Sequence, residues 1–167
     1  MRAGLEDMRT RAGEDPFLHG IPYLWCSNNL TSAAITHAQL YRRATGDESF
    51  LEMETANRDW LLGCNPWGST MISGFPEKLE EGYHSPSQCS AAFRKVAGGL
   101  VDGPIYTALF LDRIGVHLTR EDPFATFNKG VAVYHDDRGD YSSNEPTIDG
   151  TASLFYYFAA MEEAGRR

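Results

Sequence analysis

The stretch from Leu30 to Gly63, LTSAAITHAQLYRRATGDESFLEMETANRDWLLG, decides the fold class because it predicts two helices joined by a short turn. Its first half repeats bulky or apolar side chains at helical spacing, namely Leu30, Ala34, His37 and Tyr41. Its second half repeats them as Phe50, Met53, Ala56 and Trp60. Ser27 or Asn28 can cap the first helix. Gly46 suits the left-handed end of that helix, and Asp47 can cap the next one. The short connection predicts an antiparallel helix pair.

Two shorter segments also have helical spacing. Residues 5–12 place Leu5 and Met8 on one side of a helix. Residues 103–115, GPIYTALFLDRIG, predict a short helix with Pro104 in its first turn.

The last predicted helix runs from Pro146 to about Gly165. Its expected apolar face consists of Ile148, Ala152, Phe155 and Ala159. A long stretch rich in Gly, Ser and Pro, residues 65–102, lies between the helices, and its aromatic side chains argue for an ordered loop. No strand-like alternation of any length is present. The predicted fold class is therefore all-α, with helical hairpins joined by long loops.

Composition excludes several classes of function. The 167 residues suffice for a single domain with a core. A formal net charge of -8 and a pI of about 5.0 argue against nucleic acid or an anionic membrane surface as a partner. The N-terminal stretch MRAGLEDMRTRAGED is charged and has no apolar core, so this chain shows no signal peptide. Cys26, Cys64 and Cys89 are far apart, which predicts neither a metal site nor a disulfide framework.

A second stretch, VYHDDRGDYSSNEPTIDG, concentrates negative charge. Asp136, Asp137, Asp140 and Glu145 place four carboxylates within ten residues. Like charges repel, so such a cluster must be solvated, bound to a cation or used in chemistry. Its spacing does not match the register of an EF-hand calcium loop. By itself the cluster is compatible with a solvated loop, a divalent cation site or a catalytic carboxylate.

Three motifs together carry a resemblance to a known family. They are NRDWLLGCNPWGSTMISGFP (57–76), GGLVDGPIYTALF (98–110) and YHDDRGDYSSNEPTIDGTASLFYYFA (134–159). With them the chain resembles, from about Pro22 to Ala160, the C-terminal part of the catalytic domain of family 9 glycoside hydrolases, the inverting cellulase-type enzymes. The resemblance implies that residues 1–167 form one domain, a C-terminal portion of an (α/α)6 barrel. It also implies a secreted or periplasmic parent that needs no cofactor and can carry structural calcium.

The resemblance also implies roles for individual residues. Glu145 matches the general acid that protonates the leaving glycosidic oxygen, and Asp136 matches the aspartate that supports it. His84 and Arg94 fall where the family contacts substrate, and Asp140 is assigned to substrate binding as well. Aromatic residues of the loops are candidates for stacking on sugar rings: Trp67, Tyr83 and Tyr141. Trp25 and Trp60 are instead expected in the core.

A glycosidase general acid must keep its proton near neutral pH. Repulsion from the three aspartates would favour protonated Glu145, whereas a helix starting at Pro146 would favour its anion. Inversion also requires a carboxylate base that activates water. The family's D-A-G-D-like base stretch is absent, since the only similar string, Asp137 to Asp140, belongs to the other motif. We therefore expect the base to come from a missing N-terminal part of the barrel or from a partner chain.

Three functions follow from these observations. The first is hydrolysis of β-1,4-glucosidic bonds in glucan oligosaccharides or polysaccharides, as part of a longer enzyme. The second is an inactive carbohydrate-binding remnant that keeps the stacking aromatics, and the third is one chain of a split barrel. The missing base argues against activity of the isolated chain.

Overall fold

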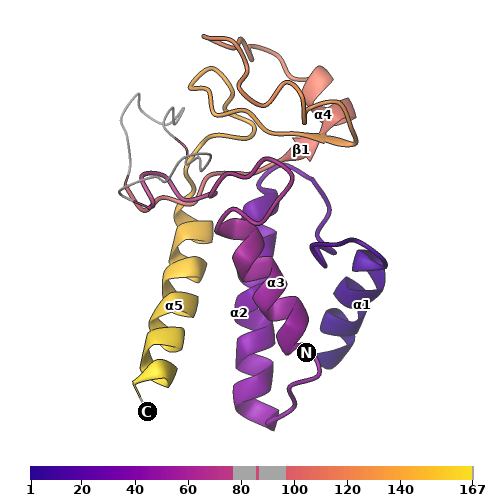
Figure 1. The fold of residues 1–167 in the computed structure, drawn as a ribbon, viewed down its shortest axis with the longest axis vertical. Helices are drawn as coiled ribbons and strands as arrows, with labels where there is room; N and C mark the ends of the chain where they lie inside the picture. Colours follow the sequence, from indigo (N-terminus) through magenta and orange to yellow (C-terminus); the bar gives the residue numbers. More distant parts are fainter. Residues whose placement is uncertain (77–85, 87–96, 167) are drawn as a thin grey trace.

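The computed structural model describes residues 1–76, 86 and 97–166. The elements of this part are α1 (Arg2–Ala12), α2 (Ser27–Thr45), α3 (Leu51–Leu61), β1 (Ile105–Tyr106), α4 (Thr107–Leu111), β2 (Ala132–Val133) and α5 (Ile148–Gly165). Helices α2, α3 and α5 lie side by side, and the long loops with α4 and β1 gather at one end of them (Figure 1). The predicted all-α class is confirmed, because the two strands are only two residues long.

The hairpin of α2 and α3 forms as expected, but α2 begins differently. Gly46 ends α2 in the left-handed conformation, with φ 72°. The predicted caps Ser27 and Asn28 are wrong, because neither side chain bonds to the amides of the helix. Ser27 Oγ donates to the carbonyl of Pro104 (2.7 Å), and Asn28 Nδ2 donates to that of Val101 (2.8 Å). These two side chains attach a distant loop to the start of α2.

Asp47 does not cap α3 either, because that helix begins at Leu51. The carboxylate accepts hydrogen bonds from Ser49, Tyr41 and Arg2 instead. Of the expected inward residues of the hairpin, Phe50, Met53 and Trp60 are buried, whereas Leu30 is exposed. The buried face of α2 is carried by Thr31, Ile35, Ala38 and Gln39, because α2 packs against both α3 and α5.

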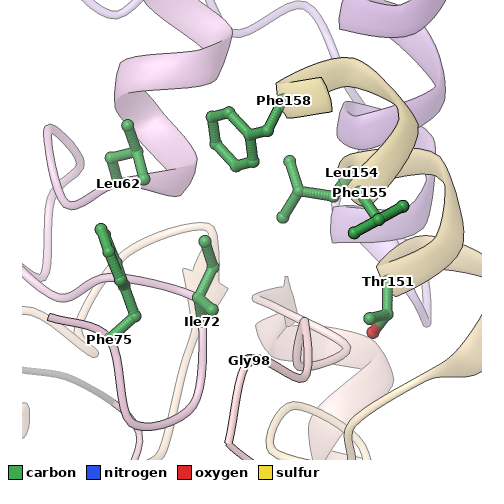
Figure 2. Close-up of a pocket in the computed structure, with 8 residues that line it drawn as sticks. All are labelled: Leu62, Ile72, Phe75, Gly98, Thr151, Leu154, Phe155 and Phe158. Carbon is green, nitrogen blue, oxygen red and sulfur yellow. The ribbon is translucent and has the colours of Figure 1, made fainter. Parts of the chain in front are cut away.

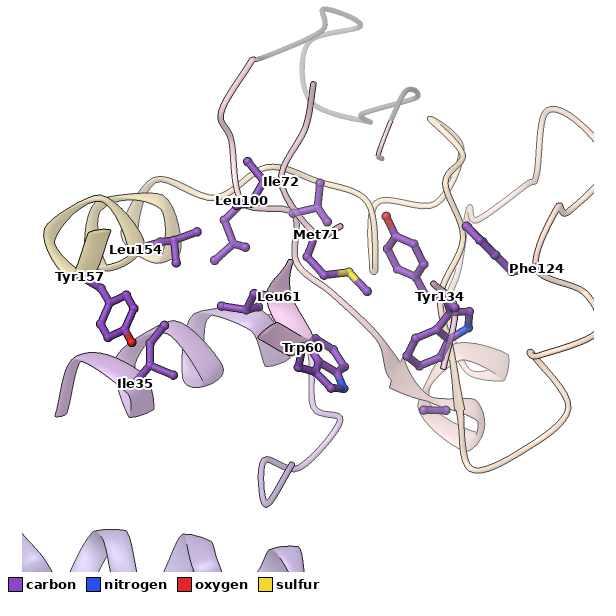
Figure 3. Close-up of a cluster of buried hydrophobic side chains, with 13 residues drawn as sticks. Ile35, Trp60, Leu61, Met71, Ile72, Leu100, Phe124, Tyr134, Leu154 and Tyr157 are labelled. Carbon is purple, nitrogen blue, oxygen red and sulfur yellow. The ribbon is translucent and has the colours of Figure 1, made fainter. Parts of the chain in front are cut away.

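The largest core cluster joins the helices to the loops. Ile35, Leu61 and Leu154 come from three different helices, and Met71 and Tyr134 come from loops (Figure 3). The loop that starts at Asn65 is ordered by that one side chain. Asn65 Nδ2 donates to the carbonyls of Trp60 and Ser69 (both 2.7 Å), and its Oδ1 accepts from the amide of Trp67 (3.1 Å). The buried Asn65 side chain therefore fixes the turn after α3, whereas Pro66 is exposed.

Short antiparallel contacts hold the loop layer together. Ile72 pairs with Leu100, and Val101 pairs with Pro146. Strand β1 pairs with β2, with Ile105 opposite Val133. The prediction of a helix that starts at Pro104 is therefore wrong, because Ile105 and Tyr106 are extended and α4 begins only at Thr107.

Helix α5 begins at Ile148, two residues later than predicted, with Thr147 at its N-cap. The expected apolar face is wrong: Ile148 is 90% exposed and Phe155 is 77% exposed. The buried residues are Gly150, Leu154 and Tyr157, which face the hairpin. Apolar side chains occur on two sides of this helix, and α2 covers only one of them. No described helix is long and apolar enough to cross a membrane.

Gly150 marks the close approach of α5 to α2. A Cβ at this position would lie 2.1 Å from Asn29 Oδ1, which also accepts a hydrogen bond from Thr147. We expect Gly150→Ala to lower the free energy of unfolding by about 1–3 kcal/mol, because it overpacks this contact. Gly165→Ala is the matched control on the same helix, since nothing lies within 4 Å of its Cβ position. Urea unfolding of both variants tests this; equal midpoints would contradict the packing argument.

A buried histidine should make stability depend on pH. His19 stacks on Trp60 with ring centroids 4.2 Å apart, and burial lowers its pKa to about 3. The unfolded chain binds the proton near pH ~6.5, so stability falls as the pH drops below that value. Between pH 7 and pH 5 the loss should be about 2 kcal/mol. His19→Gln should remove this loss, whereas His117→Gln, at an exposed position, should keep it. Urea unfolding at the two pH values measures both.

Candidate active site

The acidic motif follows β2 and ends directly before α5. Its four carboxylates lie in different surroundings: Asp136, Asp137 and Asp140 are buried, whereas Glu145 is half-buried. The three aspartates have protein partners, so the cluster is not a solvated loop.

Asp136 is tied to a neighbouring loop and to the residue before Glu145. Arg120 Nη2 donates to Asp136 Oδ2 (2.9 Å) and to its main-chain oxygen (2.6 Å). Asn144 Nδ2 lies 3.4 Å from Asp136 Oδ1. Because Asn144 directly precedes Glu145, Asp136 can fix the backbone from which the Glu145 side chain extends.

Asp137 holds the same loop from the other side. Its carboxylate accepts hydrogen bonds from the amides of Thr119 (2.8 Å), Arg120 (3.1 Å) and Gly139 (2.7 Å). A Cβ at Gly139 would lie 1.9 Å from the carbonyl oxygen of His117, so this approach requires glycine. Asp137 therefore has a structural role.

Asp140 was expected to contact substrate, and the structure contradicts this. Its Oδ1 accepts from the amide (2.9 Å) and hydroxyl (2.6 Å) of Ser142. Its Oδ2 lies 2.7 Å from His135 Nδ1 and accepts from Ser143 Oγ (2.8 Å). Burial alone would raise the pKa of Asp140, but these hydrogen bonds outweigh it and lower the pKa. Both oxygens are occupied inside the protein, so Asp140 shapes the turn.

These contacts change the expected role of the acidic cluster. Each aspartate has its own donors, and Arg120 and His135 lie against two of them, which weakens the repulsion that these aspartates exert on Glu145. The expected opposition from the helix is also reduced, because the N-cap of α5 is Thr147 and Glu145 lies outside the helix.

The structure separates the expected aromatic residues. Trp67 is only 5% exposed, packs against Trp60 and Tyr134, and donates from Nε1 to Asn128 Oδ1 (2.8 Å). Its predicted role as a sugar platform is wrong, because the ring belongs to the core. Trp60 is in the core as expected.

Trp25 is the aromatic residue that sequence reasoning misplaced. It is 43% exposed and precedes α2. Its ring lies 5.6 Å from that of half-buried Tyr141, and the guanidinium carbon of Arg113 lies 4.8 Å from the Trp25 ring centre. Its Nε1 donates to Asp102 Oδ2 (3.0 Å), and the Asp102 amide donates to the carbonyl of Glu145 (2.8 Å). Trp25 and Tyr141 thus form an aromatic pair that is linked to Glu145 through Asp102.

Trp25 and Asp102 are the two residues that the sequence did not single out as site residues. The available signal for Asp102 was its position inside the family-like string GGLVDGPIYTALF (98–110). Tyr83, His84 and Arg94 lie outside the described residues. Within the described ranges, no group of three or more His, Cys, Asp or Glu side chains could hold a metal ion.

A pocket with an apolar lining is separate from these residues. It has a volume of about 370 Å³, and side chains from α5 and the loops, including Leu62, Ile72 and Phe155, line it (Figure 2). Its described lining contains no titratable side chain.

The comparisons with known proteins identify the family. Residues 8–158 match the sequence model of glycosyl hydrolase family 9. The chain belongs to this family. No curated protein sequence matches the chain.

Three solved structures are similar in fold. AaCel9A in complex with cellobiose-like isofagomine is 21% identical, with a TM-score of 0.69, over 96% of this chain and 30% of that one. A single mutant of a thermostable endoglucanase from Alicyclobacillus acidocaldarius is 21% identical, with a TM-score of 0.68, over 95% and 30%. The cellulase CEL9M of C. cellulolyticium in complex with cellobiose is 19% identical, with a TM-score of 0.56, over 83% and 29%.

The chain spans about 30% of the length of the first of these structures. Together with the family match, the fold confirms the prediction of a partial (α/α)6 barrel.

The turn around Asp140 should contribute strongly to stability. We expect Asp140→Asn to lower the free energy of unfolding by about 2–4 kcal/mol, because the new amide faces donors and breaks a buried charge-assisted network. Asp112→Asn makes the same chemical change at an exposed position and should shift it by less than about 0.5 kcal/mol. Thermal or urea unfolding checks both, and similar effects of the two substitutions would refute the structural role of Asp140.

Proposed function

We propose that this chain is the C-terminal part of a catalytic domain that hydrolyses β-1,4-glucosidic bonds with inversion, and that Glu145 is its general acid. One observation carries the proposal. Among the four carboxylates of the motif, Glu145 alone is both half-buried and without a side-chain hydrogen bond or ion pair in the described part of the chain. A general acid needs such a carboxyl, which can reach the leaving oxygen and has no competing partner.

Asp136 is the proposed support for Glu145. Its oxygens lie against Arg120 and Asn144, and through Asn144 it acts on the backbone next to Glu145. This is a positioning role, since Asp136 is itself fully buried. Good positioning matters because small displacements of a reacting group cost large factors in rate.

The aromatic pair supports a carbohydrate as the substrate. Trp25 and Tyr141 offer partly exposed rings near Glu145, and sugar rings present apolar faces that stack on such side chains. Two of the structural neighbours are complexes with cellobiose or a cellobiose-like compound. We therefore propose a β-glucan oligosaccharide or polysaccharide as the ligand. Tyr83, His84 and Arg94 remain proposed substrate contacts.

Inversion also needs a base at a suitable distance. The two carboxyl groups of inverting glycosidases stand ~6.5–9.5 Å apart, which leaves room for the attacking water. The buried aspartates of the motif are engaged with their own donors and cannot serve. We propose that the base belongs to a further part of the barrel or to a partner chain. A carbohydrate-binding remnant is the second candidate, because the aromatic pair could bind sugar without a base.

Substitution of Glu145 tests the proposal in the longest natural polypeptide that contains this chain. Glu145→Gln should reduce turnover of a soluble β-1,4-glucan by about 10²–10⁴-fold, because the proton donor is lost. Binding of cello-oligosaccharides should persist, and Asp112→Asn should leave both unchanged. Retained turnover in Glu145→Gln would refute the acid assignment. Binding without turnover in the unsubstituted protein would favour the remnant.

The stereochemistry of the first product provides a second test. Proton NMR of the fresh hydrolysate should show the α-anomer, because a single displacement at a β-linked carbon inverts it. The β-anomer would contradict the inverting mechanism.

A further inference from the structure

Asp102 and Glu145 lie opposite each other in the short antiparallel contact between two loops. Val101 is bridged to Pro146, and two hydrogen bonds flank the bridge. The amide of Asp102 donates to Glu145 O (2.8 Å), and that of Thr147 donates to Leu100 O (2.9 Å). Opposite residues of an antiparallel pair extend to the same side, with Cβ atoms ~4.5–5.5 Å apart. This register places the two side chains on the same side of the loop contact.

The backbone around Asp102 is held rigidly in this register. Its carbonyl accepts from the amide of Asn28 (2.9 Å), and the next amide, that of Gly103, donates to Ser143 O (3.0 Å). Gly103 has a φ of +89°, and a Cβ there would lie 2.3 Å from Asn28 Cγ. The turn is thus clamped on both sides, and the Asp102 backbone cannot move without breaking these contacts.

Only one of the two oxygens of the Asp102 carboxyl group accepts a hydrogen bond from the described residues. It is 1% exposed, and its Oδ2 accepts from Trp25 Nε1 (3.0 Å). Its Oδ1 is buried and accepts no hydrogen bond from the described residues. A buried carboxylate oxygen without a donor is unfavourable, and protonation of the carboxyl relieves this cost.

The charges around Asp102 act in the same direction. From α2 it faces the Cys26 thiol, and from the motif it faces Glu145 and Asp140. Arg113 lies over the Trp25 ring and makes no ion pair with Asp102. Burial is the main cause that raises the pKa of Asp102 to about 7; the thiol and indole oppose this in part, and the negative charges of Glu145 and Asp140 add to it.

We propose that Asp102 is a positioning residue that stores a proton for Glu145, its opposite neighbour across the loop contact. A proton shared between two neighbouring carboxyl groups avoids the repulsion that arises when both are ionised. The inference rests on the proposed function, in that Glu145 is the group that uses the proton.

The proton balance is simple. The acid form of Asp102 passes its proton to Glu145, which gives it to the leaving glycosidic oxygen. Both carboxyl groups are then ionised. The pair regains one proton from solvent through Glu145, since Asp102 is enclosed. One proton leaves and one enters in each cycle.

NMR titration of the chain labelled with ¹³C at the aspartate carboxyl carbons tests the pairing. The Asp102 signal, identified by its loss in Asp102→Asn, should titrate with a midpoint of about 7. In Glu145→Gln this midpoint should fall by about one pH unit, because the negative charge of Glu145, which raises the pKa of Asp102, is removed. Asp112→Asn, which removes an exposed carboxyl, should leave the midpoint unchanged.

Either of two results would overturn the proposal: a midpoint in the ordinary aspartate range, or a midpoint that Glu145→Gln does not move. If Asp102→Asn fails to fold, the Asp102 signal can be assigned through its contact with the Trp25 indole, and Glu145→Gln still decides. The titration needs no substrate. If the protein hydrolyses the glucan but Glu145→Gln does not shift the Asp102 midpoint, this inference alone is refuted. If the midpoint shifts as expected but the protein does not hydrolyse the glucan, only the proposed function is refuted.

Discussion

The candidate site depends on one clamped turn, residues 101–104, which lies between the start of α2 and the segment that carries Glu145. Asn28 donates its side-chain amide to Val101 O (2.8 Å) from one side, and the Asp102 amide donates to Glu145 O (2.8 Å) on the other. Through this turn the N-terminal end of a helix and a motif more than a hundred residues later share one backbone framework. Buried amide and carbonyl groups must be paired, so such a framework tolerates little change.

The carboxylates of the acidic motif differ in role: the three aspartates stabilise the loops, and Glu145 is the proposed general acid. Asp137 and Asp140 close turns with backbone and hydroxyl donors, and Asp136 fastens the residue before Glu145. Glu145 is left half-buried and unpaired among the described residues. A dense cluster of like charges is therefore compatible with folding here, because each buried member is neutralised or hydrogen-bonded locally.

Much of the fold could be predicted from the sequence because its signals are local. Helical spacing and the left-handed Gly46 suffice to predict the α2–α3 hairpin, and the family motifs suffice to predict a partial barrel. The predictions failed where one local sequence pattern is compatible with two different tertiary arrangements. Ser27 and Asn28 are typical cap residues, yet their side chains bond to a loop more than seventy residues away. Helix α5 has two apolar sides, and periodicity cannot tell which of them α2 covers.

The sequence alone determined which residue types the site contains: the carboxylates of the motif, the tryptophans and the Asn-Pro turn. Only the tertiary structure decided their roles. It buried Trp67 in the core and left Trp25 exposed, and it placed Asp102 opposite Glu145. The physical reason is that burial and pairing depend on contacts between segments far apart in the chain. Those contacts form only when the loops pack onto the helices, and no local pattern encodes them.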